Sequence, residues 1–166
     1  MFQGCTSLTQ APELPATTLA DHCYNSMFNG CSSLTQAPVL PATTLANFCY
    51  DSMFRGCTSL TQAPALPATN LKIYCYESMF RDCTSLTQAP ELPATTLTSW
   101  CYYSMFNGCT SLSSLKVAFT AWGSQTAAWL NNVAATGTFE CPQALIDNTT
   151  TRDANTVPES WTMTAV

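Results

Sequence analysis

The stretch MFNGCSSLTQAPVLPATTLANFCYDS, residues 27–52, has a near copy on each side of it. MFQGCTSLTQAPELPATTLADHCYNS precedes it at 1–26, and MFRGCTSLTQAPALPATNLKIYCYES follows at 53–78. The Met-Phe pair opens every copy at a constant spacing, at Met1, Met27, Met53, Met79 and Met105. A fixed period of this length indicates one small structural unit that buries its apolar side by stacking on its neighbours.

The first half of each unit reads as a short extended segment. In SLTQAPEL, residues 7–14, Leu8, Ala11 and Leu14 can point inward while the polar residues between them point outward. Each copy has a proline here, which removes a backbone donor and limits the strand to a few ladder bonds. These prolines are Pro12, Pro38, Pro64 and Pro90.

The second half of each unit has a helical spacing of apolar residues. Cys23, Met27 and Phe28 fall at i, i+4 and i+5, which favours one face of a short helix. Gly30 lies where such a helix would end in a left-handed residue, and Asp82 takes that position in the fourth copy. The sequence therefore predicts an α/β leucine-rich-repeat solenoid of four to five 26-residue coils, each with a short parallel strand and a short helix. We expect the repeat array to cover residues 1–112.

The remaining segment, 113–166, departs from the period. Residues 113–122, 137–142 and 159–166 are strand-like, 126–133 reads as a short helix, and 147–158 is a polar loop. Because a solenoid needs an atypical last unit to cover its apolar end, we interpret 113–166 as a C-terminal cap. A separate functional module is the alternative.

The ten cysteines fall mostly in two columns of the repeat. Equivalent residues of neighbouring coils lie about 4.8 Å apart, whereas a disulfide needs Cβ atoms about 3.8 Å apart. We therefore favour buried free thiols, with some bridges as the second possibility and zinc as the third. The columns are Cys5, Cys31, Cys57, Cys83 and Cys109, and Cys23, Cys49, Cys75 and Cys101; Cys141 stands apart.

Composition excludes several classes of function. Only 9% of the residues are charged and the net charge is −5, so five scattered basic residues cannot form a nucleic-acid site or a polybasic membrane patch. The apolar runs are too short for a membrane helix. Catalysis is not expected, because the one histidine shares its repeat position with three aromatic residues. The carboxylates Glu13 and Glu91 lie three coils apart, about 14 Å at strand spacing. No cofactor and no metal are expected.

Two columns of the repeat are candidate ligand-contacting positions. In one column the residue type varies but the side chain always contains a ring. We call it the ring column: His22, Phe48, Tyr74 and Trp100. The other is constant, and we call it the glutamine row: Gln10, Gln36, Gln62 and Gln88. The ring column fits a stripe that stacks on a glycan or a protein, but a drifting solvated surface and packing on the neighbouring coil remain open.

The run C-x-x-L-x-x-A-P-x-L-P, preceded by Met-Phe, resembles the BspA-like (Treponema pallidum-type) leucine-rich repeat. The wording GCTSLTQAPELPATTL further resembles repeat proteins of gut Bacteroidetes, and the stretch TGTFECP through VPESWTM resembles the tail that often closes those arrays. Met stands where that repeat usually has Ala, and the unit is slightly longer. The resemblance implies secreted or surface-attached binding and adhesion proteins, without catalysis and without fixed ligand residues.

The expected function is thus a non-catalytic extracellular or cell-surface module for protein–protein interaction or adhesion. A glycan-binding module that uses the ring column and a passive spacer that displays another domain are the alternatives. The expected partner is a host or bacterial surface protein, or a glycan, with no nucleic acid and no membrane insertion. No signal peptide or anchor is recognisable. Because residue 1 already lies within a repeat, we expect a fragment of a longer exported protein, or an end-to-end homodimer through residues 1–26.

Overall fold

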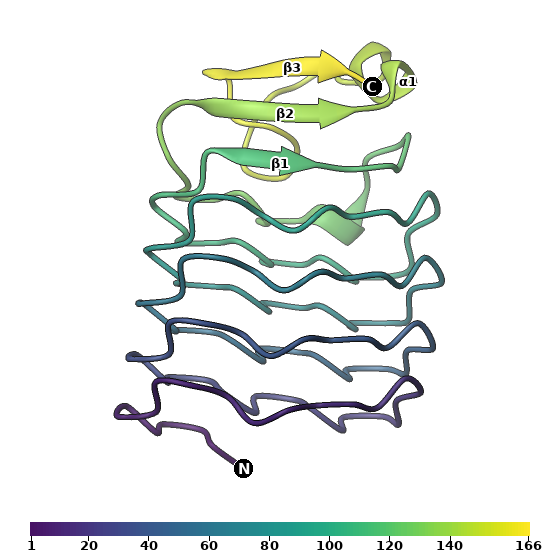
Figure 1. Cartoon of the computed structure of the whole chain (residues 1–166). Helices are drawn as coiled ribbons and strands as arrows, with labels where there is room; N and C mark the ends of the chain where they lie inside the picture. Colours follow the sequence, from purple (N-terminus) through teal and green to yellow (C-terminus); the bar gives the residue numbers. More distant parts are fainter.

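The structure, a computed structural model, describes all of residues 1–166 as a stack of chain turns that we call coils (Figure 1). Each coil has a front segment, near the viewer in Figure 1, and a back segment behind it. Backbone bonds join residues about one repeat apart along the whole array, for example from Phe28 to Met53 and from Phe54 to Met79. Most of the chain is turn and irregular extended structure.

Regular elements occur only near the C-terminus. Strands β1 (Ser114–Lys116), β2 (Gly137–Cys141) and β3 (Trp161–Ala165) form a parallel sheet in that order. The 3₁₀ helix η1 (Ser124–Thr126) and the helix α1 (Gln143–Asp147) lie in the connections. The three predicted strands of residues 113–166 are thus confirmed, whereas α1 was not predicted.

Proline explains why the front segments of the earlier coils are not strands. In those coils the front pairing is reduced to isolated parallel contacts, such as Gln10 with Gln36 and Gln62 with Gln88. Where the prolines disappear from the segment, at 113–120, the pairing extends into β1 and continues into β2 and β3. The prediction that proline limits each strand is confirmed. The strand expected in each of the first four coils is reduced to single bridging residues.

The prediction of a short helix in each coil is wrong. Residues 20–31 and their equivalents form a run of overlapping turns, which we call the turn strip. In the strip of residues 20–31, the odd-numbered residues from Cys23 on donate to the carbonyl three residues back, as Asn25 does to His22. Even-numbered residues donate to the next coil at 2.7–3.0 Å between nitrogen and oxygen. These donors are His22, Tyr24, Ser26, Phe28 and Gly30, and their acceptors are Asn47, Cys49, Asp51, Met53 and Arg55.

The strip needs a left-handed residue at every fourth position, which no α-helix contains. In the strip of residues 46–57 these residues are Phe48 (φ 54°), Ser52 (φ 54°) and Gly56 (φ 71°). Asp82 keeps the left-handed conformation (φ 62°) at the position that is glycine in the other copies. The predicted left-handed glycine is therefore confirmed, but it ends a run of turns.

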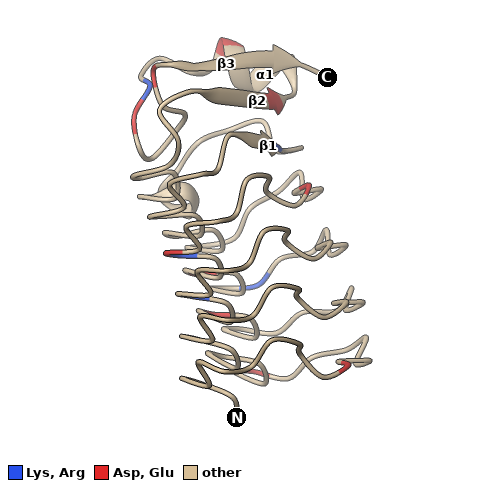
Figure 2. Cartoon of the chain, turned by 60° about the vertical axis from the view of Figure 1, so that its left-hand side comes forward, with Lys and Arg blue, Asp and Glu red and all other residues tan.

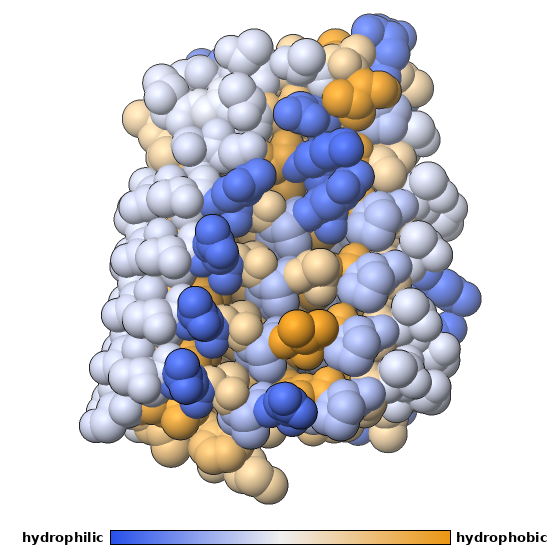
Figure 3. Space-filling model, in the orientation of Figure 1, coloured by the Kyte–Doolittle hydropathy of each residue, from blue (hydrophilic) through white to orange (hydrophobic).

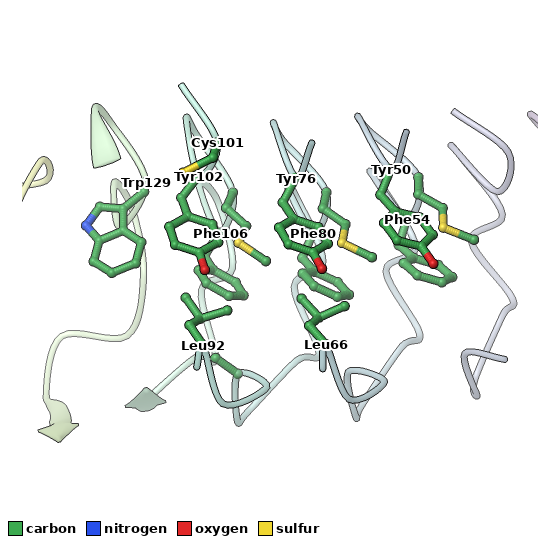
Figure 4. Packing of buried hydrophobic residues seen from close by; sticks show 14 of the residues in the cluster. Tyr50, Phe54, Leu66, Tyr76, Phe80, Leu92, Cys101, Tyr102, Phe106 and Trp129 are labelled. Carbon is green, nitrogen blue, oxygen red and sulfur yellow. The ribbon is translucent and has the colours of Figure 1, made fainter. Parts of the chain in front are cut away.

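The core between the front segments and the turn strip consists of columns of identical side chains (Figure 4). Phe28, Phe54, Phe80 and Phe106 are fully buried, and their rings stack in parallel at 5.6–5.7 Å between centroids. A second column of stacked rings contains Tyr24, Tyr50, Tyr76 and Tyr102 at 5.7–6.1 Å. Stacking one coil on the next thus buries the same rings repeatedly.

All ten cysteines are free, and eight are buried, as the column geometry predicts. In the column that starts at Cys5, every thiol after the first donates to a phenylalanine carbonyl 29 residues earlier, as Cys57 Sγ does to the Phe28 oxygen at 3.2 Å. Burial raises the pKa of the Cys57 thiol to about 12, with a smaller contribution from Cys31. Burial likewise raises the pKa of Cys49 to about 11. These thiols are protonated at neutral pH, which makes them poor nucleophiles and poor metal ligands.

Residues 113–166 continue the winding with shorter coils. Ser114 pairs with Thr138, and Thr138 pairs with Thr162, so partners here are slightly closer in the chain than equivalent residues of the repeat copies. The turn strip continues too, because Phe106 donates to the Trp129 carbonyl and Ala128 is left-handed. The turns at 127–132 replace most of the helix expected at 126–133.

The left-handed position generates the first prediction. Asp82→Gly should raise the free energy of unfolding by about 0.5–1 kcal/mol, because glycine adopts this conformation without strain. Its ion pairs with Arg55 and Arg81, at 3.9 and 3.6 Å, join half-exposed side chains and contribute little. Gly56→Ala should have the opposite effect, about 1 kcal/mol. Urea denaturation of both variants is the measurement, and a destabilised Asp82→Gly protein would contradict it.

A second prediction concerns the hydroxyl of Tyr76, which is buried without a hydrogen-bond partner. Tyr76→Phe removes that oxygen and keeps the stacked ring, so the free energy of unfolding should rise by about 1 kcal/mol. Tyr24→Phe is the matched control, because Tyr24 is half-buried in the same column and its hydroxyl should matter little. Equal or lower thermal stability of Tyr76→Phe would show that the hydroxyl has a partner in solution.

Candidate functional site

The two predicted sets of contact residues lie on opposite layers and do not form one site. The ring column belongs to the turn strip, behind the core in Figure 1, whereas the glutamine row belongs to the front segments. Stacking of the coils brings the members of each set together, but the buried phenylalanine and tyrosine columns separate the two sets.

In the ring column the rings stack on one another. His22 lies 4.7 Å from Phe48 and Phe48 lies 4.8 Å from Tyr74, with interplanar angles of 6° and 15°. Tyr74 and Trp100 follow at 6.3 Å and 6°, and Tyr103 forms a T-shaped contact with Trp100 at 5.3 Å between centroids. His22 is exposed, and the other three are half-buried.

This stacking decides what the ring column can offer a ligand. A sugar binds an aromatic residue through the face of the ring, where the negative charge of the π-system lies. In the column each inner face is covered by the ring of the neighbouring coil, so Phe48 and Tyr74 present mainly their edges. The position serves coil-to-coil packing first, which sequence inspection left as an open alternative.

The front layer carries the glutamine row and a second column whose residues vary between hydrophilic and hydrophobic (Figure 3). All four glutamines of the row are exposed. Three shallow hollows lie along this layer, of about 300, 210 and 200 Å³. The second of them is lined by Gln36 and Gln62 with neighbouring Thr, Ala and Pro residues. The second column runs Glu13, Val39, Ala65, Glu91, Lys116 and Glu140.

Charged residues are sparse along the stack (Figure 2), and two of those on the front layer form an ion pair. Lys116 Nζ lies 3.1 Å from Glu91 Oε1 on the neighbouring coil. Glu13 at the other end of the column has no ion pair. Val39 between them is 80% exposed, more than any other large apolar residue except Met1. The front layer thus combines uncovered apolar surface with a free carboxylate.

The turn strip holds a carboxylate pair that the sequence analysis did not find. Asp51 accepts hydrogen bonds from Asn25 Nδ2 at 2.8 Å and from Ser52 Oγ at 2.7 Å, so both its oxygens are held. Glu77 occupies the equivalent position on the next coil. Burial first, and then the charge of Asp51, raise the pKa of Glu77 from 4.5 to about 7. The signal in the sequence was the column Asn25, Asp51 and Glu77, read together as neighbours.

No group of three or more His, Cys, Asp or Glu side chains converges as a metal ion would require. None of the helices has the length and apolar character needed to cross a bilayer. No protein-family model, curated protein or solved structure matches the chain.

The raised pKa of Glu77 predicts a pH-dependent stability. The folded state keeps the proton to about pH 7, whereas the unfolded chain releases it near pH 4.5, so the stabilisation is complete below 4.5 and is lost as the pH rises through 7. Glu77→Gln mimics the protonated form. At pH 8 it should raise the free energy of unfolding by about 1–2 kcal/mol, a value reduced for solvent screening at this half-buried position.

The measurement is urea denaturation of both proteins at pH 4 and pH 8. The two should agree at pH 4 and separate at pH 8, while Glu13→Gln, at an exposed position, should track the unmodified protein throughout. A difference of the same size at both pH values would assign the effect to packing instead of charge.

Proposed function

We propose that the chain is a leucine-rich-repeat solenoid of the BspA-like type that acts as a non-catalytic binding or adhesion module outside the cell or at its surface. Its partner would be a host or bacterial surface protein. The front layer is the contact surface in this proposal, with the glutamine row at its centre.

The observation that carries the proposal is that the backbone bonds between coils are concentrated in the turn strip and are few in the front layer. The turn strip holds the coils together through its backbone bonds, and the ring column packs within it. The front segments of the second and third coils, residues 32–46 and 58–72, share no backbone hydrogen bond with each other. Their polar backbone groups and exposed side chains are free to bind an extended partner. Backbone groups and exposed side chains that the stack does not use for its own bonds support a binding role.

The stacking of the rings disfavours the glycan alternative, because the faces that a sugar would cover are already covered. Only the outer face of His22 and the surroundings of Trp100 lie outside the stacked contacts. The passive spacer has no observation in its favour beyond the regularity of the stack, and it is kept as an outcome of the test.

The test is a binding screen with the immobilised chain against host matrix proteins, bacterial surface extracts and a glycan array. We expect binding to at least one protein target that is lost when Gln36 and Gln62 are both replaced by Lys on the front layer. Replacing Tyr74 by Lys on the turn strip is the matched control and should leave binding in place. Binding to glycans alone would favour the second function, and silence on every target would favour the spacer.

A further inference from the structure

We propose that the hollow between the first two coils binds an aromatic side chain of a partner polypeptide, flanked in that partner by a basic residue. This inference rests on the proposed binding function and names the chemistry of the partner. The hollow has a volume of about 300 Å³. Ligand pockets begin at about this size, so the hollow fits one large side chain.

The lining of the hollow suits a flat apolar ring. Its walls are proline rings and aliphatic side chains from two neighbouring coils, including Val39, whose side chain is left uncovered. Aromatic side chains bury large apolar areas at low entropic cost and are the usual anchors of protein interfaces. The lining residues are Ala11, Pro12, Glu13, Leu14 and Pro15 from the first coil, and Pro38, Val39 and Pro41 from the second.

The backbone around the hollow is unpaired. Residues 11–16 and 37–42 neither donate nor accept a backbone hydrogen bond of ordinary length within the chain. Each non-proline residue there carries a donor and an acceptor that need a partner or water. An extended peptide across the hollow can use them for main-chain bonds, as peptides do at exposed sheet edges. The partner is therefore an extended segment of polypeptide.

Charge determines the residue beside the anchor. Glu13 lines the hollow and has no cation within the chain, and the protein carries a net charge of −5. Across an interface, opposite charges favour association and like charges disfavour it. A Lys or Arg next to the aromatic residue would supply the missing cation.

The repeat provides its own matched comparison two coils further along. The corresponding hollow, of about 200 Å³, is lined by Ala65, Leu66, Pro67, Glu91 and Pro93. There Ala65 takes the place of Glu13 and Glu91 takes the place of Val39, and Lys116 Nζ already lies 3.1 Å from Glu91. The hollow at Ala65 is built from the same part of the repeat, but it has neither an exposed valine nor an unpaired carboxylate. It should therefore not bind the same peptide segment.

The experiment is an NMR titration of the whole chain with three capped tripeptides, Gly-Trp-Arg, Gly-Trp-Glu and Gly-Ala-Arg. We expect Gly-Trp-Arg to shift the Val39 and Leu14 methyl signals and to leave Leu66 unshifted, with a Kd on the order of 1 mM. Gly-Trp-Glu should bind about five-fold more weakly, because of the repulsion from Glu13. Gly-Ala-Arg should produce no shift. Equal shifts from all three peptides, or equal shifts at both hollows, would overturn the inference.

Variants test the roles of the individual lining residues. Glu13→Gln should remove the preference for Arg over Glu in the peptide while leaving the fold unchanged, since the Glu13 side chain is exposed. Ala65→Glu and Glu91→Val together, with Lys116→Ala to remove the nearby cation, should create binding in the hollow at Ala65, and failure to do so would count against the assignment. If the chain binds a surface protein in the screen and Glu13→Gln and Val39→Ser leave that binding intact, this inference fails and the proposed function stands. If the chain binds no target but takes up Gly-Trp-Arg as expected, the proposed function fails alone.

Discussion

In the turn strip, every second backbone N–H group donates to a carbonyl of the next coil, with lengths of 2.7–3.0 Å at the first junction. The N–H groups between them close turns within the coil. This alternation is possible only because a left-handed residue recurs at every fourth position. It stacks consecutive coils in register, and the register places each phenylalanine ring on the phenylalanine of the neighbouring coil.

Because the strip supplies most of the bonds between coils, the front segments of the first four coils need only a few, such as the bond from Leu19 to Thr44 at 2.9 Å. They can contain two prolines per copy, which a hydrogen-bonded central strand would not tolerate. The prolines in turn shape the hollow at Val39 and leave the backbone around it unpaired. Where the prolines are missing, β1, β2 and β3 pair in full and the layer becomes an ordinary parallel sheet. One layer therefore maintains the stack and the other is open to binding.

Much of this fold could be predicted from the sequence, and the part that could not has a physical cause. The constant repeat period, the left-handed Gly30, the buried cysteine columns and the effect of proline all follow from residue types at fixed spacing. The helix was mispredicted because apolar residues at i, i+4 and i+5 fit a run of turns that repeats at every fourth position as well as a helix. The left-handed conformation of Phe48 could not be predicted from its residue type, because bulky residues rarely adopt that conformation.

The candidate site was less predictable because it depends on distances between coils. Two sets of residues from the same repeat were correctly grouped, yet nothing in the letters says that the rings cover one another or that the two sets lie on opposite layers. The link between Asp51 and Glu77 likewise exists only once two coils are stacked, because a full repeat copy separates them in the chain. Features that lie within one repeat copy can be predicted from the sequence. Contacts between two coils can be predicted only when the register in which the coils stack is known.

The uniformity of the junctions has a consequence for how such a chain can change over time. Each coil in the array meets its neighbours through the same donors, the same stacked rings and the same thiol-to-carbonyl contacts. A whole repeat unit can be gained or lost without creating any junction that the structure does not already contain. Unequal recombination between the nearly identical gene segments would therefore yield folded products of different length, all with the same C-terminal sheet. The reach of the front layer can be adjusted in this way in steps of about 4.8 Å, one coil at a time.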